Sequence, residues 1–257
     1  MKNFRNIIFI FSILVFFSCS SKKNILYLQD IDEKSNIKFE YSDYKIKIGD
    51  ILKIDIITDN QEVSLQFNPK VASSNVNNTK DAILYNGFQV DALGYINFPT
   101  IGKIKALDKS ILELRDYMYN FITEKKYLNN PFIDIKHINS HFTVIGEVNK
   151  PGRYDFLDTN MNILKAIGLS GDLTINGKRN DIKLIREIEG EQVVSSIDLT
   201  KSDFINAGSF QILSGDIIIV NPNSARVKNA GIIGNSGTLI SLLSFLLSSI
   251  IVLGYNN

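Results

Sequence analysis

Alternating apolar and polar residues in the first half of the chain predict short strands. Residues 44–56 alternate on both sides of Gly49 and Asp50, which predicts a strand, a tight turn and a second strand. Residues 59–86 are rich in asparagine and serine and predict a loop. Residues 87–98 predict a hairpin that turns near Gly94, followed by a short strand at residues 102–104.

Helical spacing of apolar residues predicts two helices. Ser110 and Glu113 form a capping-box sequence, and the apolar positions after them continue at helical spacing to about residue 126. We interpret these apolar positions as core. A shorter helix is predicted at residues 161–167, closed by Gly168 and Gly171.

Strand patterns dominate the second half of the chain. They cover residues 132–138, 142–148, 153–156, 181–185, 193–199 and 216–220. Residues 214–220 also repeat the Gly-Asp turn and strand of residues 48–54. Strands interrupted by a few helices predict an α+β fold.

The C-terminal stretch, residues 235–254, carries no charge. As a helix it would be roughly 30 Å long, which matches a bilayer core. We therefore predict a transmembrane helix there, after a linker at residues 223–234. Leucines fall on one face, and small residues that allow close helix packing or face water fall on the other: Gly234, Gly237, Ser241, Ser244 and Ser248. A simple anchor and a buried core helix are the alternatives.

The N-terminus has the layout of a secretory signal peptide, with Lys2 and Arg5 ahead of an apolar run at residues 7–17. It ends at Cys19, the single cysteine, in a sequence that resembles a bacterial lipobox. We predict cleavage after residue 18, acylation of Cys19 and a tether at residues 19–42. Ser20 in place of aspartate favours the outer membrane. An ordinary signal peptide and a retained anchor remain alternatives.

Composition and motifs exclude several classes of function. The chain has 28 basic and 27 acidic residues, so its net charge of +1 gives no electrostatic case for nucleic acid. His137 and His141 lack neighbouring ligands in sequence, and we predict no metal site. The sequence contains no Gly-x-x-x-x-Gly-Lys phosphate loop and no Gly-x-Ser-x-Gly elbow. We therefore expect no cofactor and name no catalytic residue.

Three segments together resemble the outer-membrane polysaccharide export lipoproteins: residues 44–56, residues 91–102, and residues 144–154 with their continuation to residue 220. The resemblance implies a polysaccharide export domain at residues 43–139 and one soluble-ligand-binding β-grasp domain at residues 140–222. It also implies a ring of identical subunits, often eight, with its body in the periplasm and a barrel of C-terminal helices through the outer membrane.

The leading hypothesis is a non-catalytic channel subunit that exports capsular or exopolysaccharide. An inner-membrane polysaccharide copolymerase of the tyrosine-kinase type would be its partner. One alternative is a membrane-anchored β-grasp protein that binds glycan without forming a channel. The other is a periplasmic glycan hydrolase.

Overall fold

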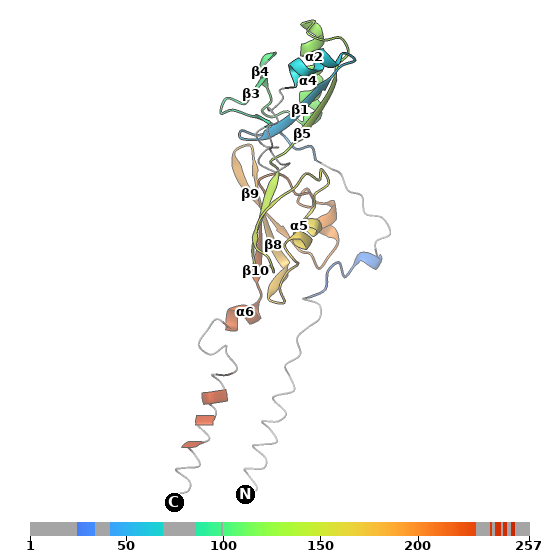
Figure 1. Cartoon of the computed structure of the whole chain (residues 1–257). Helices are drawn as coiled ribbons and strands as arrows, with labels where there is room; N and C mark the ends of the chain where they lie inside the picture. The colour runs from blue at the N-terminus through green and yellow to red at the C-terminus, as the bar shows by residue number, and fades with distance from the viewer. Residues whose placement is uncertain are drawn as a thin grey trace, which may run out of the picture.

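Two bodies, each with its own sheet and hydrophobic core, follow one another along the chain (Figure 1). The computed structural model describes residues 25–33, 42–68, 86–98 and 100–229, together with residues 237, 240–242, 244–245 and 248–249. Sheets with few helices confirm the predicted α+β class.

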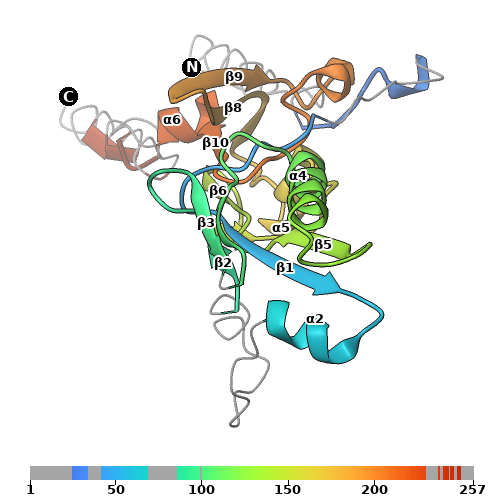
Figure 2. The same cartoon turned by 90° about the horizontal axis from the view of Figure 1, so that it is seen from above.

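The first body is built on a three-stranded antiparallel sheet of order β2-β1-β5 (Figure 2). Its strands are β1 (Ile51–Ile57), β2 (Phe88–Gln89) and β5 (Phe132–His137), and a separate hairpin joins β3 (Tyr95–Phe98) to β4 (Gly102–Lys105). The helix α4 (Ile111–Glu124) packs against the sheet. Alternate residues of β1 and one side of α4 supply much of the core: Leu52, Ile54, Ile56, Leu114, Met118 and Ile122.

The predicted capping box starts α4. The Ser110 hydroxyl accepts a hydrogen bond from the Glu113 backbone N–H at 3.1 Å, and Glu113 Oε2 accepts one from the Ser110 N–H at 2.6 Å. Two backbone donors that the helix itself leaves unpaired are thereby satisfied.

The second body is a five-stranded sheet of order β7-β6-β10-β8-β9. The strands are β6 (His141–Gly146), β7 (Gly152–Asp155), β8 (Gly177–Ile188), β9 (Glu191–Ile197) and β10 (Ile217–Pro222). β10 pairs with β6 in parallel, and the other pairs are antiparallel. The core side chains come from the sheet and from α5 (Ile163–Leu169).

Three predictions in the first body were wrong. Residues 42–47 form no strand; instead the Ile46 N–H donates to the Lys109 carbonyl at 2.9 Å. The chain does turn at Gly94, where the Gly94 N–H donates to the Asp91 carbonyl at 2.8 Å, but the flanking strands form no hairpin, because β2 pairs with β1 and β3 pairs with β4. The predicted loop contains the helix α2 (Gln61–Phe67), capped by the Asn60 side chain.

Parts of the segments that flank the two bodies have structure and contacts of their own. Within residues 25–33, which include a 3-10 helix (Ile31–Glu33), the Leu28 N–H donates to the Leu199 carbonyl at 3.0 Å. Asp30 Oδ1 accepts from the Ser202 N–H at 2.7 Å, so this part of the tether is attached to the second body. The linker begins with the helix α6 (Ser224–Asn229). No helix within the described residues has the length and apolarity that a membrane crossing requires.

Candidate functional site

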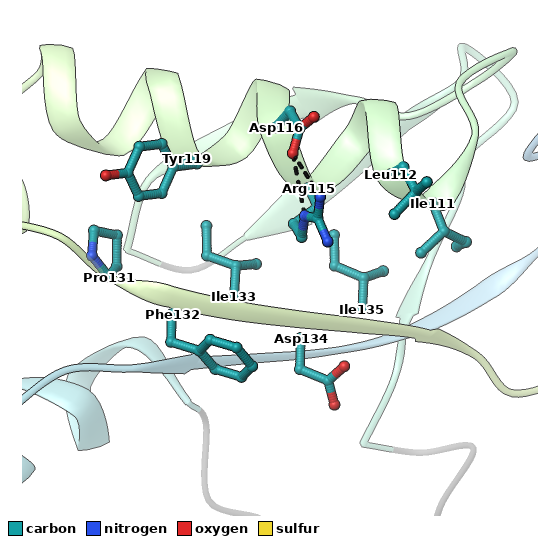
Figure 3. Close-up of a pocket in the computed structure, with 10 residues that line it drawn as sticks. All are labelled: Ile111, Leu112, Arg115, Asp116, Tyr119, Pro131, Phe132, Ile133, Asp134 and Ile135. Carbon is teal, nitrogen blue, oxygen red and sulfur yellow. Dashed lines mark hydrogen bonds and ion pairs between the residues drawn. The ribbon is translucent and has the colours of Figure 1, made fainter.

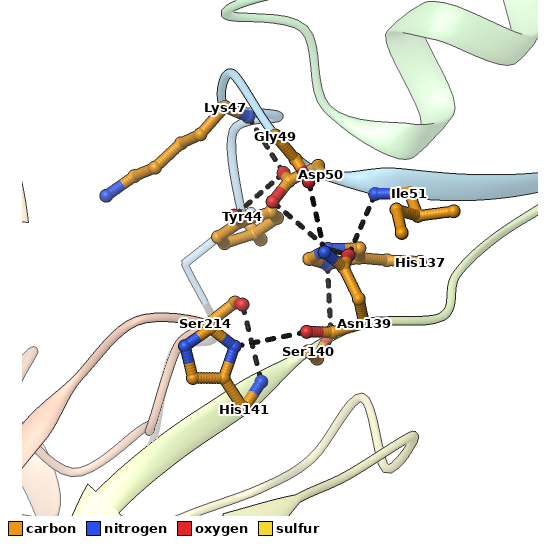
Figure 4. A network of polar contacts seen from close by, with 10 residues as sticks. All are labelled: Tyr44, Lys47, Gly49, Asp50, Ile51, His137, Asn139, Ser140, His141 and Ser214. Atoms are coloured by element: carbon orange, nitrogen blue, oxygen red, sulfur yellow. Dashed lines mark hydrogen bonds and ion pairs between the residues drawn. The ribbon is translucent and has the colours of Figure 1, made fainter. Parts of the chain in front are cut away.

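The two bodies meet at a joint, residues 138–140, between β5 and β6 (Figure 4). The Asn139 side chain fixes the joint to the first body, because its Oδ1 accepts from the Ile51 N–H at 2.8 Å and its Nδ2 donates to the Gly49 carbonyl at 3.1 Å. On the other side, the Ser140 carbonyl accepts from the Phe156 N–H of the second body at 3.0 Å. The joint is therefore bonded to both bodies.

Each body presents a Gly-Asp turn near the joint. Gly49 and Gly215 have φ values of +86° and +90°, a region that favours glycine. The following carboxylates, Asp50 and Asp216, are buried, and each accepts a hydrogen bond from the backbone N–H three residues earlier at 2.8 Å. The repeat seen in the sequence is thus a repeated turn that buries a carboxylate.

The two buried carboxylates have different partners. Asp216 accepts two hydrogen bonds from the Arg186 guanidinium, at 2.9 and 2.7 Å. Asp50 accepts one from the Tyr44 hydroxyl at 2.8 Å, and its Oδ1 lies 3.2 Å from His137 Nε2. Pairing of this kind is what makes a buried carboxylate tolerable.

When the His137 ring is neutral, its surroundings select one tautomer. Nε2 lies beside two acceptors, the Asp50 carboxylate and Asn139 Oδ1 at 2.8 Å, so it carries the proton. Nδ1 then accepts from the Ser140 hydroxyl at 2.8 Å. The Tyr44 ring stacks on the imidazole with a centroid distance of 5.1 Å. Burial, and then the Asp50 charge, raise the pKa of Tyr44 well above its usual 10, so its hydroxyl remains a donor at neutral pH.

A cleft of about 860 Å³ opens beside this network, between the two bodies. Its walls come from β1, β5 and the start of α4 in the first body, and from residues 156–160 and 211–214 in the second. Ser42 crosses from one body to the other, donating from its N–H to Gln211 Oε1 at 2.9 Å. The volume and the mixture of apolar and polar groups suit a small ligand.

A second hollow, of about 540 Å³, lies between α4 and β5 (Figure 3). Its guanidinium and one of its carboxylates neutralise each other, because Arg115 donates to Asp116 at 3.0 Å. Ile133 and Ile135 point toward α4, whereas Asp134 points to the other side of β5. Because its walls come from one body alone, we take the cleft at the joint as the candidate site.

Comparison with known families identifies both bodies. A model described as polysaccharide biosynthesis/export protein matches residues 40–137, and a model of the SLBB domain matches residues 140–220. The chain belongs to the polysaccharide export family. This export protein has a role related to polysaccharide export, and the two matched ranges meet at the joint. None of the curated proteins matches the chain.

None of the predicted site residues that the structure of this export protein describes belongs to the cleft lining. Cys19 and Gly234 are outside the described residues. Four others are helical and exposed: Gly237, Ser241, Ser244 and Ser248. The Ser244 hydroxyl donates to the Ile240 carbonyl at 2.7 Å, and the Ser248 hydroxyl donates to the Ser244 carbonyl. These two hydroxyls are satisfied within their own helix.

Sequence reasoning missed the group Tyr44, Asp50 and His137. The signal for His137 was present, because Ile133, Ile135 and His137 occupy alternate positions of one strand and therefore share a face. The signal for Asp50 was the repeated Gly-Asp turn. Among the described residues, no group of three or more His, Cys, Asp or Glu side chains is arranged to hold a metal.

Proposed function

We propose that this export protein is a non-catalytic subunit of an oligomeric outer-membrane channel for capsular or exopolysaccharide. The order of its segments supports this: a predicted signal peptide at residues 1–18 before Cys19, the export domain, the SLBB domain and an uncharged C-terminal stretch. Acylated Cys19 and a C-terminal helix would hold each subunit to the outer membrane. An inner-membrane copolymerase would deliver the polymer to the ring.

The face of small residues in the C-terminal stretch is the observation that carries the proposal. Small side chains let helices approach closely where lipid offers no hydrogen bonds. Ser244 and Ser248 donate to carbonyls of their own helix, so that face does not depend on a partner to satisfy them. In the proposed ring, helices pack through this face around a wet lumen while the leucines meet lipid.

The contacts of α6 support an orientation for the subunit. Arg226 Nε lies 3.3 Å from Glu147 Oε1, which ties α6 to the second body. The N-terminal residues 25–33 contact the same body. Both membrane signals therefore extend from segments attached to the second body, and in this proposal the first body faces the inner-membrane partner.

Replacing Ser241, Ser244 and Ser248 together with leucine tests the channel. We expect the leucine variant to lose ring assembly and to stop polysaccharide reaching the cell surface, because bulky side chains close the small-residue face. The matched alanine variant keeps that face small and should assemble. Light scattering in mild detergent and surface staining of polysaccharide measure the two outcomes.

A glycan-binding protein that forms no channel is the second candidate, and the cleft at the joint favours it. Mass in mild detergent separates the two candidates. A monomeric wild-type protein, or a leucine variant that still exports, would exclude the channel and leave the binding protein.

A further inference from the structure

On one face of the first sheet, residues with the same charge lie directly opposite each other on neighbouring strands. In the register of β1 and β5, Lys53 lies opposite Lys136 and Asp55 lies opposite Asp134. Like charges directly across a strand pair destabilise a sheet. Each lysine instead pairs along its own strand, Lys53 with Asp55 and Lys136 with Asp134, both at 2.9 Å.

A favourable arrangement of the same residues is available. Exchanging Asp134 and Lys136 would place opposite charges in both cross-strand pairs, at Lys53 and at Asp55, with no change in composition. The existing order costs stability and places Lys53 directly opposite Lys136, with each ammonium group 2.9 Å from the aspartate two residues away on its own strand. Departures from a local rule of this kind tend to mark functional sites.

One of these two cross-strand pairs lines the cleft at the joint. Lys53 and Lys136 belong to its lining, whereas Asp55 and Asp134 do not. Each ammonium group has three N–H donors, and its aspartate partner takes one of them. The two lysine side chains are 45% and 65% exposed, so a ligand in the cleft can reach the remaining donors.

Of the other charged groups in the cleft lining, two have partners and one is exposed. Asp158 is paired with Lys165 at 2.6 Å, and His137 faces the Asp50 carboxylate. Asp43 is exposed and precedes Tyr44, which lies at the joint. Amide and hydroxyl groups from the second body, among them Asn160 and Gln211, complete the polar lining.

We propose that the cleft binds an acidic sugar residue of the exported polymer, with its carboxylate held between Lys53 and Lys136. This inference rests on the proposed function, which makes a polysaccharide the cargo, and it adds that the cargo is anionic. The two ammonium groups, one from each strand, can each form a charge-assisted hydrogen bond to one oxygen of a carboxylate. Amides and hydroxyls recognise the sugar hydroxyls, and the exposed Leu157 packs against the ring carbons.

The exchange variant D134K/K136D tests the proposal directly. Calorimetry at low salt compares trigalacturonic acid with its methyl ester, which lacks the charge, on the full-length protein in detergent. We expect the wild type to bind the acid about tenfold more tightly than the ester. The variant should lose this preference. Its melting temperature should stay equal or rise, because both cross-strand pairs now join opposite charges.

The variant R153D/D155R is the matched control, since it exchanges an exposed i, i+2 pair on β7 outside the cleft lining. It should keep the preference for the acid. If the exchange variant unfolds, K53Q/K136Q replaces it and should lose the preference in the same way. Equal affinity of the wild type for acid and ester, or an unchanged preference in the lysine variants, would refute the anionic site.

Measurements of ligand preference, assembly and export together distinguish a failure of the acidic subsite from a failure of the proposed channel. A wild type that assembles and exports polymer but does not prefer the acid removes only the acidic subsite. A wild type that is monomeric and does not export removes the proposed function, and acid binding then belongs to a glycan-binding protein.

Discussion

At the scale of single residues, two half-buried tyrosines donate hydrogen bonds to carboxylates. Tyr44 donates to Asp50 at the joint, and Tyr27 donates to Asp172 where the N-terminal segment contacts the second body. Burial, and then the hydrogen bond to Asp172, raise the pKa of Tyr27 to about 12. The phenolate form is disfavoured at both positions because it would lose solvation and face a carboxylate.

These pKa shifts predict a loss of stability at high pH. An unfolded tyrosine releases its proton near pH 10, whereas the folded protein holds the proton to higher pH. The stabilisation is therefore complete below about pH 10 and falls as the pH rises toward the folded pKa. Urea midpoints between pH 8 and 11 should decline in the wild type, and less steeply in Y27F and Y44F. Y119F, at an exposed tyrosine, is the control, and equal declines in all four proteins would contradict the prediction.

At the scale of elements, the parallel pairing of β6 with β10 depends on Gly146. Its φ is +95°, and an added Cβ would lie 2.1 Å from the Val220 carbonyl oxygen. That oxygen accepts a hydrogen bond from the Glu147 N–H at 3.0 Å, so it is held within the sheet. Both the backbone conformation and the close approach therefore require glycine.

Replacing Gly146 with alanine should destabilise the second body by about 3 kcal/mol or more, through backbone strain and the clash with β10. Gly152, on the neighbouring β7, has no atom within 4 Å of an added Cβ. G152A should therefore change stability by less than about 0.5 kcal/mol. Thermal melting of the two variants measures the difference, and equal melting temperatures would show that the close approach is not limiting.

At the scale of the whole molecule, the joint sets how the two bodies are positioned. The Asn139 side chain bonds to β1 and to the turn before it, although Asn139 lies in the segment that leads into β6. Lys47 adds a second link, because its Nζ donates to the Glu187 carbonyl at 2.9 Å on the β8–β9 hairpin. Together with the contact of Ser42 with Gln211, these links help to position the two bodies that form the walls of the cleft.

Replacing Asn139 with alanine should loosen the joint without unfolding either core. Removing its hydrogen bonds costs about 2 kcal/mol, and small-angle X-ray scattering should show a broader distribution of distances between the bodies. The two cores should then melt in separate transitions. N120A, at an exposed position of α4, is the control. A single transition and an unchanged scattering profile in N139A would show that other contacts fix the joint.

Local pattern by itself determined most of the elements of this protein. The capping box predicted the start of α4, and the alternation of apolar and polar residues predicted β5 to β10. Burial of one face of a strand requires an apolar residue at every second position, and this period is visible in the sequence. The order of motifs also determined the family.

The tertiary structure decided which segments pair and which side chains meet. The strands on either side of Gly94 take partners other than each other, since pairing depends on packing between segments distant in sequence. Tyr44 and His137, which are close to the two ends of the first body's sequence, both contact Asp50. Lys53 and Lys136 are 83 positions apart in the chain, and only the register of β1 with β5 places them opposite each other. The sequence pattern predicts which face of its strand or helix each residue occupies. Which of these faces come into contact is decided only when the sheets form and the two bodies are joined.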